Sequence, residues 1–193
     1  MTDEHGNLFG PQFDETRFKK GQEADDIVQG AIEEAFEAKN IVAIEDDEAY
    51  DNFRDDKDLH EILDYSGIDY LVDTFHDPAF GINHRNHFKS YHSLFDVRAD
   101  TGSKSPSELD KLRKAHRWDI VPKYATRMKI PEGEEVEWFR VVDLHAFVEA
   151  LDDGELSVAN EWEDYDNNVT AWMFDYDDLR DKRLVVDEID PQV

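Results

Sequence analysis

The chain contains no cysteine, little lysine and no long run of apolar residues. Without cysteine it has no disulfide framework, no thiolate metal site and no cysteine nucleophile. Its first ten residues, MTDEHGNLFG, lack the basic and apolar regions of an export signal. No stretch approaches the roughly 18 apolar residues that a membrane helix needs. We therefore expect a cytoplasmic protein with no membrane segment.

Acidic residues dominate the composition. The 193 residues include 48 Asp and Glu against 21 Lys and Arg, a net charge of −27. This excess excludes a generally basic nucleic-acid binder and a polybasic protein of membrane surfaces. Hydrophobic residues make up 39% of the chain and aromatic residues 12%, which a disordered acidic tail would lack. The length fits one domain with a sizeable core.

The ratio of Asp to Glu and the low lysine content indicate a more specific class of acidic protein. Asp outnumbers Glu by 29 to 19, and lysine occurs only 11 times. This pattern is similar to that of proteins from salt-loving archaea and their viruses. At about 1 M salt the Debye length is roughly 3 Å, so the self-repulsion of such a chain is screened. We expect a high-salt cytoplasm or a virion as its location; the alternative is a solvated acidic surface with no specific partner.

One segment has the opposite charge. Between Arg85 and Lys129 eleven cations face five acids. We call this segment the basic island. A surface that binds a polyanion would explain it, and nucleic acid is then the expected partner. Pairing with acidic surface elsewhere in the fold would explain it equally well. Besides Arg85 and Lys129, the cations are Lys89, Arg98, Lys104, Lys111, Arg113, Lys114, Arg117, Lys123 and Arg127.

Apolar periodicity predicts one mixed α/β domain, with a single mixed β-sheet flanked by helices. Residues 1–20 are expected to form an irregular arm, and the acidic stretches 45–60 and 155–169 to be loops. Helices are predicted over 22–39, 106–117 and 144–151, the last capped by Asp143. Strand-like runs lie at 41–44, 68–73, 79–85, 94–98, 124–130, 137–142, 170–174 and 183–186.

The candidate catalytic residues lie in two short segments, Gly67-Ile68-Asp69-Tyr70 and Gly81-Ile82-Asn83-His84-Arg85. Strand alternation places Asn83 and Arg85 on one face of the second strand. If the two strands form a hairpin, Asp69 converges with them. A carboxylate suits Mg²⁺, an amide oxygen is a weaker ligand, and a guanidinium steadies a phosphate or a developing oxyanion.

At these residues the sequence resembles the restriction-endonuclease-like, or PD-(D/E)XK, nuclease superfamily. That core is a helix, a strand hairpin carrying Asp and then Glu/Asp-x-Lys, a second helix and a further strand. The resemblance covers roughly residues 20–130 and leaves 131–193 as a C-terminal extension. It implies Asp69 as the metal ligand, Asn83 and Arg85 in place of Glu-x-Lys, and Glu23 or Glu34 completing the site from the first helix.

The implied activity is metal-dependent phosphodiester hydrolysis, with Mg²⁺ polarising the phosphate and lowering the pKa of a bound water. Two departures weaken that expectation. Asn83 removes a charged ligand, and Arg85 cannot act as a base because its proton does not come off. The alternatives are a non-catalytic module that binds nucleic acid or a protein partner, and a structural component of a viral or mobile-element assembly. The oligomeric state stays open.

Overall fold

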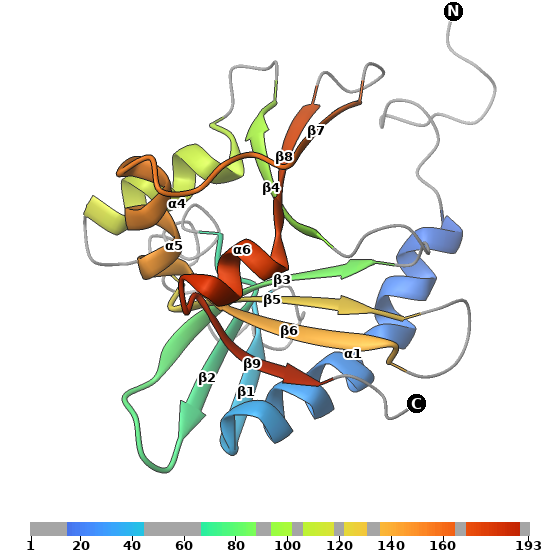
Figure 1. Ribbon diagram of the computed structural model, residues 1–193. Helices are drawn as coiled ribbons and strands as arrows, with labels where there is room; N and C mark the ends of the chain where they lie inside the picture. Colours follow the sequence, from blue (N-terminus) through green and yellow to red (C-terminus); the bar gives the residue numbers. More distant parts are fainter. Residues whose placement is uncertain are drawn as a thin grey trace, which may run out of the picture.

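The computed structural model describes residues 15–44, 67–87, 94–101, 106–117, 122–130, 136–164 and 169–189 (Figure 1). Its helices are α1 (Glu15–Phe36), α4 (Glu108–Arg117), α5 (Leu144–Asp152) and α6 (Tyr176–Asp181). Its strands are β1 (Ala38–Ala43), β2 (Tyr70–Thr74), β3 (Phe80–His87), β4 (Leu94–Asp100), β5 (Tyr124–Lys129), β6 (Trp138–Asp143), β7 (Asn160–Asp164), β8 (Val169–Asp175) and β9 (Val185–Ile189). None of the described helices is both long enough and apolar enough to cross a bilayer.

A six-stranded mixed sheet forms the centre of the molecule, in the order β1-β2-β3-β5-β6-β9. Strands β3 and β5 run parallel, and the other neighbouring pairs run antiparallel. The α/β class and the mixed sheet predicted from the sequence are confirmed. The expected hairpin is also present, because β2 pairs with β3 and Leu71 lies opposite Gly81.

Helix α1 covers one face of this sheet (Figure 1). Its apolar residues recur at helical spacing, and the side chains of Val28 and Ile32 are fully buried. They belong to a core cluster with Val72 of β2, Ile82 of β3 and other sheet residues. Burial of this stripe, more than intrinsic helix propensity, stabilises the helix in this position.

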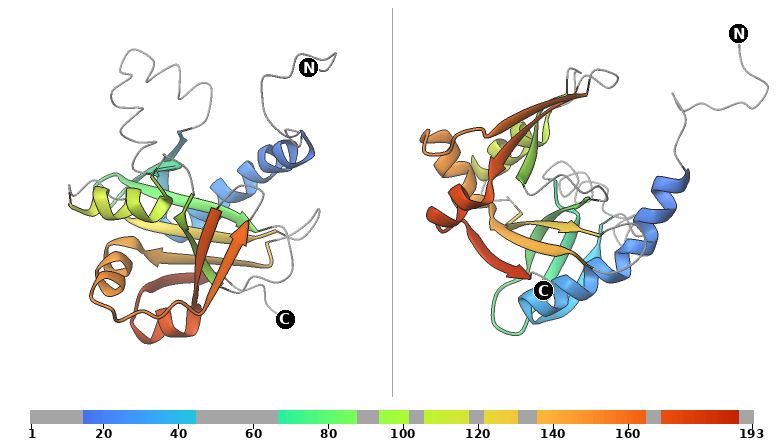
Figure 2. Two further views of the ribbon diagram at one scale, coloured as in Figure 1. Left: turned by 90° about the horizontal axis from the view of Figure 1, so that it is seen from above. Right: turned by 45° about the vertical axis from the view of Figure 1, so that its right-hand side comes forward.

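The opposite face of the sheet is covered by a second layer, which Figure 2 shows from two further directions. This layer consists of a three-stranded sheet in the order β4-β8-β7 together with α4, α5 and α6. Phe95, Phe147 and Phe174 pack edge to face in its core, with ring centroids 5.0 Å apart. Strand β4 thereby lies over the centre of the main sheet, close to β3 and β5.

Several sequence expectations were wrong in detail. The main sheet is not the only one, since β4, β7 and β8 form a sheet of their own. Helix α1 begins at Glu15, inside the expected irregular arm. Strand β7 lies within the expected acidic loop, and α6 was not predicted. Strand β7 has mostly exposed side chains, so it has no apolar alternation and depends on backbone pairing with β8. The expected loop at 45–60 lies outside the described residues.

Candidate nucleic-acid site

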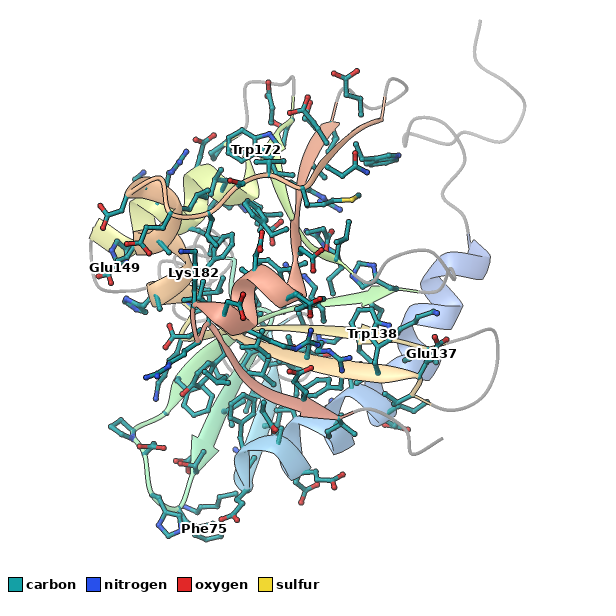
Figure 3. All side chains as sticks on the ribbon, in the orientation of Figure 1. Phe75, Glu137, Trp138, Glu149, Trp172 and Lys182 are labelled. Carbon is teal, nitrogen blue, oxygen red and sulfur yellow. The ribbon has the colours of Figure 1, made fainter. Side chains whose placement is uncertain are left out.

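The β2–β3 hairpin brings Asp69 against Asn83. The Asp69 Oδ2 atom accepts hydrogen bonds from the backbone N–H of His84 at 2.6 Å and from Asn83 Nδ2 at 3.3 Å. Gly81 permits this close approach, because a Cβ at that position would lie 2.8 Å from the Cδ1 atom of Ile68. Beyond the site the hairpin projects outward, and Figure 3 shows exposed Phe75 at its tip.

Arg127 fixes the orientation of the Asn83 amide. Its Nη1 donates to Asn83 Oδ1 at 3.0 Å, while Asn83 Nδ2 donates to the carbonyl oxygen of Gly67 at 3.0 Å. The amide oxygen is therefore engaged by a guanidinium, and the amide Nδ2 is the Asn83 atom that lies toward Asp69. A metal ion beside Asp69 would meet hydrogen-bond donors at this position, which cannot coordinate it.

Three arginines lie side by side on the same face of the sheet. Strand register places Arg85 beside Arg127, and Arg127 beside Arg140. Three like charges on neighbouring strands repel one another unless acids lie between them. The Arg127 side chain is 0% exposed, so it could not remain charged there without partners.

Acids from the second layer and from the sheet edge supply those partners. Asp96 of β4 and Glu108 of α4 both contact Arg85, and Glu108 Oε2 lies 2.6 Å from Arg85 Nη2. Arg127 Nε lies 3.2 Å from Asp96 Oδ1, and its Nη2 lies 3.5 Å from Glu108 Oε1. At the sheet edge Arg140 Nε pairs with Glu188 of β9 at 2.9 Å.

The pKa shifts follow from this arrangement. Burial raises the pKa of the Asp96 carboxyl, but Arg85, His87 and Arg127 together outweigh burial, so that pKa lies well below its ordinary value. Glu108 behaves in the same way, with Arg85 and Arg127 lowering its pKa against the effect of burial. Both acids are ionised at neutral pH. Two guanidinium charges therefore face two carboxylate charges, and the cluster is neutral.

A separate polar group lies on the α1 side of β3. His84 Nε2 lies 2.9 Å from Asn86 Oδ1, and His84 Nδ1 lies 2.7 Å from Thr126 Oγ1. Because an amide oxygen only accepts, Nε2 carries the proton and Nδ1 accepts from the threonine hydroxyl. Burial lowers the pKa of His84 to about 3, since the charged imidazolium would lose its water. The ring is neutral and structural at physiological pH.

Of the residues that the sequence predicted for catalysis, three share one face. Asp69, Asn83 and Arg85 lie along a single hydrogen-bonded network that also contains Arg127. Glu23 lies on α1, the helix that covers the other face, and its side chain lies outside the described residues. Glu34 is on the same helix and is exposed.

In the described part of the chain, four cations of the basic island, Arg85, Arg113, Arg127 and Lys129, form ion pairs. Arg113 Nε pairs with Asp152 at 2.8 Å, and Lys129 with Glu137 at 2.5 Å. Lys123 Nζ lies 5.0 Å from the ring centroid of Tyr124. Arg98 and Lys114 are exposed and Lys111 is half-buried; the last two lie on α4. Arg117 ends α4 but its side chain lies outside the described residues, as do Lys89 and Lys104.

Sequence reasoning missed Asp96 and Glu108 as members of this cluster. Both are acids inside the basic island, and Asp96 lies between Phe95 and Val97 in a strand whose apolar side chains are buried. Strand alternation puts Asp96 on the face opposite Phe95 and Val97, so the burial expected of those two residues did not indicate that Asp96 is itself half-buried. Its partner could not be identified, because Asp96 and Arg127 are distant in the sequence.

Comparison with protein-family models, with curated proteins and with solved structures found no match to this chain. Within the described residues no group of three or more His, Asp or Glu side chains is arranged to hold a metal ion.

Proposed function

We propose that this chain is a nucleic-acid-binding protein with an endonuclease-like core, in which hydrogen bonds replace the metal site. The observation that carries the proposal is the orientation of Asn83. Its amide N–H groups face Asp69, and its oxygen is held by buried Arg127. Asp69 thus has hydrogen-bond donors where the resemblance to PD-(D/E)XK nucleases would place Mg²⁺.

The order of the helices and strands supports a relationship to the PD-(D/E)XK nucleases. Helix α1 is followed by the antiparallel strands β1, β2 and β3, then by β4 of the second sheet, then by α4, and then by β5 parallel to β3. The resemblance implies this order of helix, strand hairpin, helix and further strand. The contact between Asp69 and Asn83, with Arg85 two residues further along the same strand face, is the second support.

Helix α4 is the element we assign to the nucleic-acid contact. It carries Lys111, Arg113, Lys114 and Arg117 within ten residues of a chain whose net charge is −27. Its apolar residues Leu109 and Leu112 are buried against the second layer. Lysine and arginine side chains along such a helix can contact backbone phosphates without reading sequence.

The test is binding of fluorescently labelled DNA and RNA by anisotropy, at stepwise increasing KCl. We expect saturable binding that weakens as salt rises, because phosphate contacts release counterions. The double variant Lys111→Glu/Lys114→Glu should bind more weakly. Lys111→Glu and Lys39→Glu, single variants with the same change of charge, are compared as well: Lys39, on β1 and paired with Asp73, lies outside α4 and its variant should bind as the unaltered protein does. Absence of binding to either nucleic acid would refute the proposal.

A second candidate is an active metal-dependent endonuclease. It is favoured by the position of Asp69, the carboxylate that the resemblance makes the metal ligand, within 3.3 Å of Asn83 Nδ2. Mg²⁺ would bind at Asp69 and Arg85 would stabilise charge on the phosphate. Cleavage of DNA with Mg²⁺ or Mn²⁺ in molar KCl, abolished by Asp69→Ala, would establish this function and overturn the non-hydrolytic one.

A further inference from the structure

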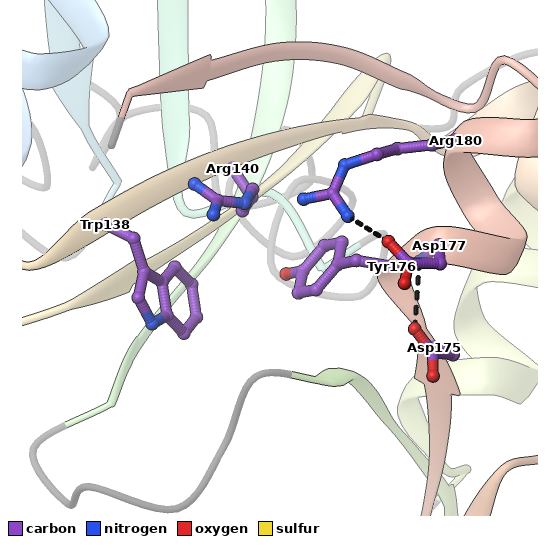
Figure 4. A pocket seen from close by; sticks show the side chains of 6 residues that line it. All are labelled: Trp138, Arg140, Asp175, Tyr176, Asp177 and Arg180. Carbon is purple, nitrogen blue, oxygen red and sulfur yellow. Dashed lines mark hydrogen bonds and ion pairs between the residues drawn. The ribbon is translucent and has the colours of Figure 1, made fainter. Parts of the chain in front are cut away.

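A small pocket lies beside the arginine row, where α6 meets β6 (Figure 4). Its volume is about 170 Å³, below the roughly 300–1,000 Å³ of sites for drug-sized ligands. A single ring system is therefore a better match to its size than a whole nucleotide. The lining residues are Trp138, Arg140, Asp175, Tyr176, Asp177 and Arg180.

The pocket contains a buried polar group with no partner. Tyr176 is only 4% exposed, and its hydroxyl makes no hydrogen bond with any residue in the described part of the chain. In Figure 4 this hydroxyl points toward the space between Trp138 and Arg140. Burial raises the pKa of Tyr176, so the phenol keeps its proton and can donate it. A buried hydroxyl without a partner is unfavourable, and an acceptor atom of a bound ligand would remove that cost.

The pocket is lined mainly by flat groups. The Trp138 and Tyr176 rings lie 6.1 Å apart between centroids at 71°. The Arg140 guanidinium lies 5.6 Å from the Trp138 centroid and 5.9 Å from that of Tyr176, and the Arg180 guanidinium lies 6.0 Å from Tyr176. Aromatic faces and guanidinium planes are the surfaces on which planar unsaturated rings stack.

Both guanidinium groups of the pocket are already paired with carboxylates, and exposed Asp175 accepts a hydrogen bond from the backbone N–H of Asp177. Arg180 makes two hydrogen bonds of 2.7 Å to Glu188, and Glu188 also lies 2.9 Å from Arg140 Nε. Arg180 Nη1 donates to Asp177 at 2.6 Å. An anionic ligand would have to compete with both carboxylates, and a cationic ligand with both guanidinium groups. A neutral ligand would not have to break either kind of ion pair.

We propose that this pocket binds a neutral planar heteroaromatic ring of the nucleobase class, one of whose acceptor atoms takes the hydrogen bond from Tyr176. The choice of a nucleobase rests on the proposed function, because a nucleic acid bound along α4 supplies such rings at its ends and in unpaired segments. The site itself rests on the cavity, the unpartnered hydroxyl and the flat walls.

The test uses the full chain in molar KCl and free nucleosides, which carry no phosphate. Guanosine and adenosine are titrated by calorimetry, with saturation-transfer NMR to identify the bound protons. We expect saturable binding of at least one nucleoside through its base protons. Tyr176→Phe should weaken it roughly 2- to 12-fold, the effect of one neutral hydrogen bond. Tyr124→Phe, which removes a hydroxyl from a half-exposed ring on the α1 side, is the control.

A second variant tests the site if Tyr176→Phe perturbs folding. Arg180→Gln removes one flat wall at the surface and should also weaken nucleoside binding. Binding of inorganic phosphate or acetate in place of nucleosides would overturn the proposal in favour of an anion site. Binding of neither would show that the pocket holds only water, which also overturns it.

Nucleic-acid binding along α4 and nucleobase binding in the pocket can be contradicted independently. If nucleosides bind but labelled DNA and RNA do not, the proposed function falls and the pocket stands. If DNA or RNA binds but no nucleoside does, the pocket assignment falls and the nucleic-acid contact on α4 stands.

Discussion

Arg127 Nη1 lies 3.0 Å from Asn83 Oδ1, and this hydrogen bond joins the parallel strands β3 and β5 on the inner face of the sheet. The Arg127 side chain is fully buried. It also contacts Asp96 and Glu108 from the second layer. One guanidinium thus orients the amide beside Asp69 and connects the main sheet to β4 and α4.

The first prediction concerns Asn83→Asp. The substitution removes the Nδ2 donor, which lies 3.3 Å from Asp69 Oδ2, and introduces a second carboxylate there. We expect a loss of roughly 1–3 kcal/mol of unfolding free energy, lessened by pairing of the new acid with Arg127. Two facing carboxylates suit a hard cation, so Mn²⁺ should raise the midpoint of thermal unfolding.

Asn83→Ala is the matched control for this experiment. It also loses the amide hydrogen bonds, but it gains no metal ligand, so we expect destabilisation that Mn²⁺ does not reverse. If Mn²⁺ stabilises the unaltered protein as strongly as the Asn83→Asp variant, the amide does not take the place of a metal ion.

The second prediction concerns Arg127→Met. This change leaves Asp96 and Glu108 with Arg85 as their remaining guanidinium partner and leaves the Asn83 oxygen unpaired. Breaking a buried ion pair in this way costs about 3–5 kcal/mol of unfolding free energy. Arg113→Met is the comparison, because its pair with Asp152 is partly exposed and should contribute no more than about 1 kcal/mol. Urea unfolding in molar KCl measures both, and equal losses would contradict a central role for Arg127.

Local features of the sequence were enough to predict the hairpin and the last long helix. Period-two alternation placed Asn83 and Arg85 on one face; Asn83 Nδ2 lies 3.3 Å from Asp69 Oδ2, whereas Arg85 contacts Asp96 and Glu108. Asp143 was expected to cap α5, and its Oδ1 accepts from the backbone N–H of Ala146 at 3.0 Å. Such signals span only a few residues, so a single sequence contains them in full.

Features that depend on distant segments were not predictable in this way. Nothing near Asp96 indicates that its partner is Arg127 of β5 or that β4 joins β8 and not the main sheet. The pattern Asn160-Glu161-Trp162-Glu163-Asp164 of β7 lacks buried alternation, because its mainly exposed side chains place few demands on the sequence. The neutral character of the arginine cluster likewise arises from contacts between layers.

The third prediction concerns pH and His84. Its pKa is about 3 in the folded protein against 6.5 ordinarily, because burial, with Arg127, His87 and Arg85 nearby, disfavours the charged ring. The unfolded chain therefore binds more protons between these values, and stability falls as the pH is lowered through this window. Because pH 5 lies 1.5 pH units below the ordinary pKa of 6.5, the loss there is at most roughly 2 kcal/mol.

His84→Gln removes this titration while keeping a polar side chain. We expect the unfolding free energy of the variant to decline less between pH 7 and pH 5 than that of the unaltered protein. The comparison of the two curves isolates His84, since the other acids and histidines are common to both. Parallel curves would show that His84 does not titrate differently in the folded and unfolded chains.

The last prediction concerns salt. A net charge of −27 on 193 residues opposes compaction, and the buried pairs of Arg85 and Arg127 do nothing to relieve it because that cluster is neutral. Raising KCl to about 1 M shortens the Debye length to roughly 3 Å and screens the repulsion between surface acids. We therefore expect the midpoint of thermal unfolding, followed by circular dichroism, to rise steadily from dilute buffer to molar KCl. Buried pairs are screened much less, so Arg127→Met should cost a similar free energy at both salt concentrations wherever the chain is folded. A protein that unfolds at the same temperature in dilute and molar KCl would contradict the high-salt interpretation of its composition, and the acids would then be an ordinary hydrated surface.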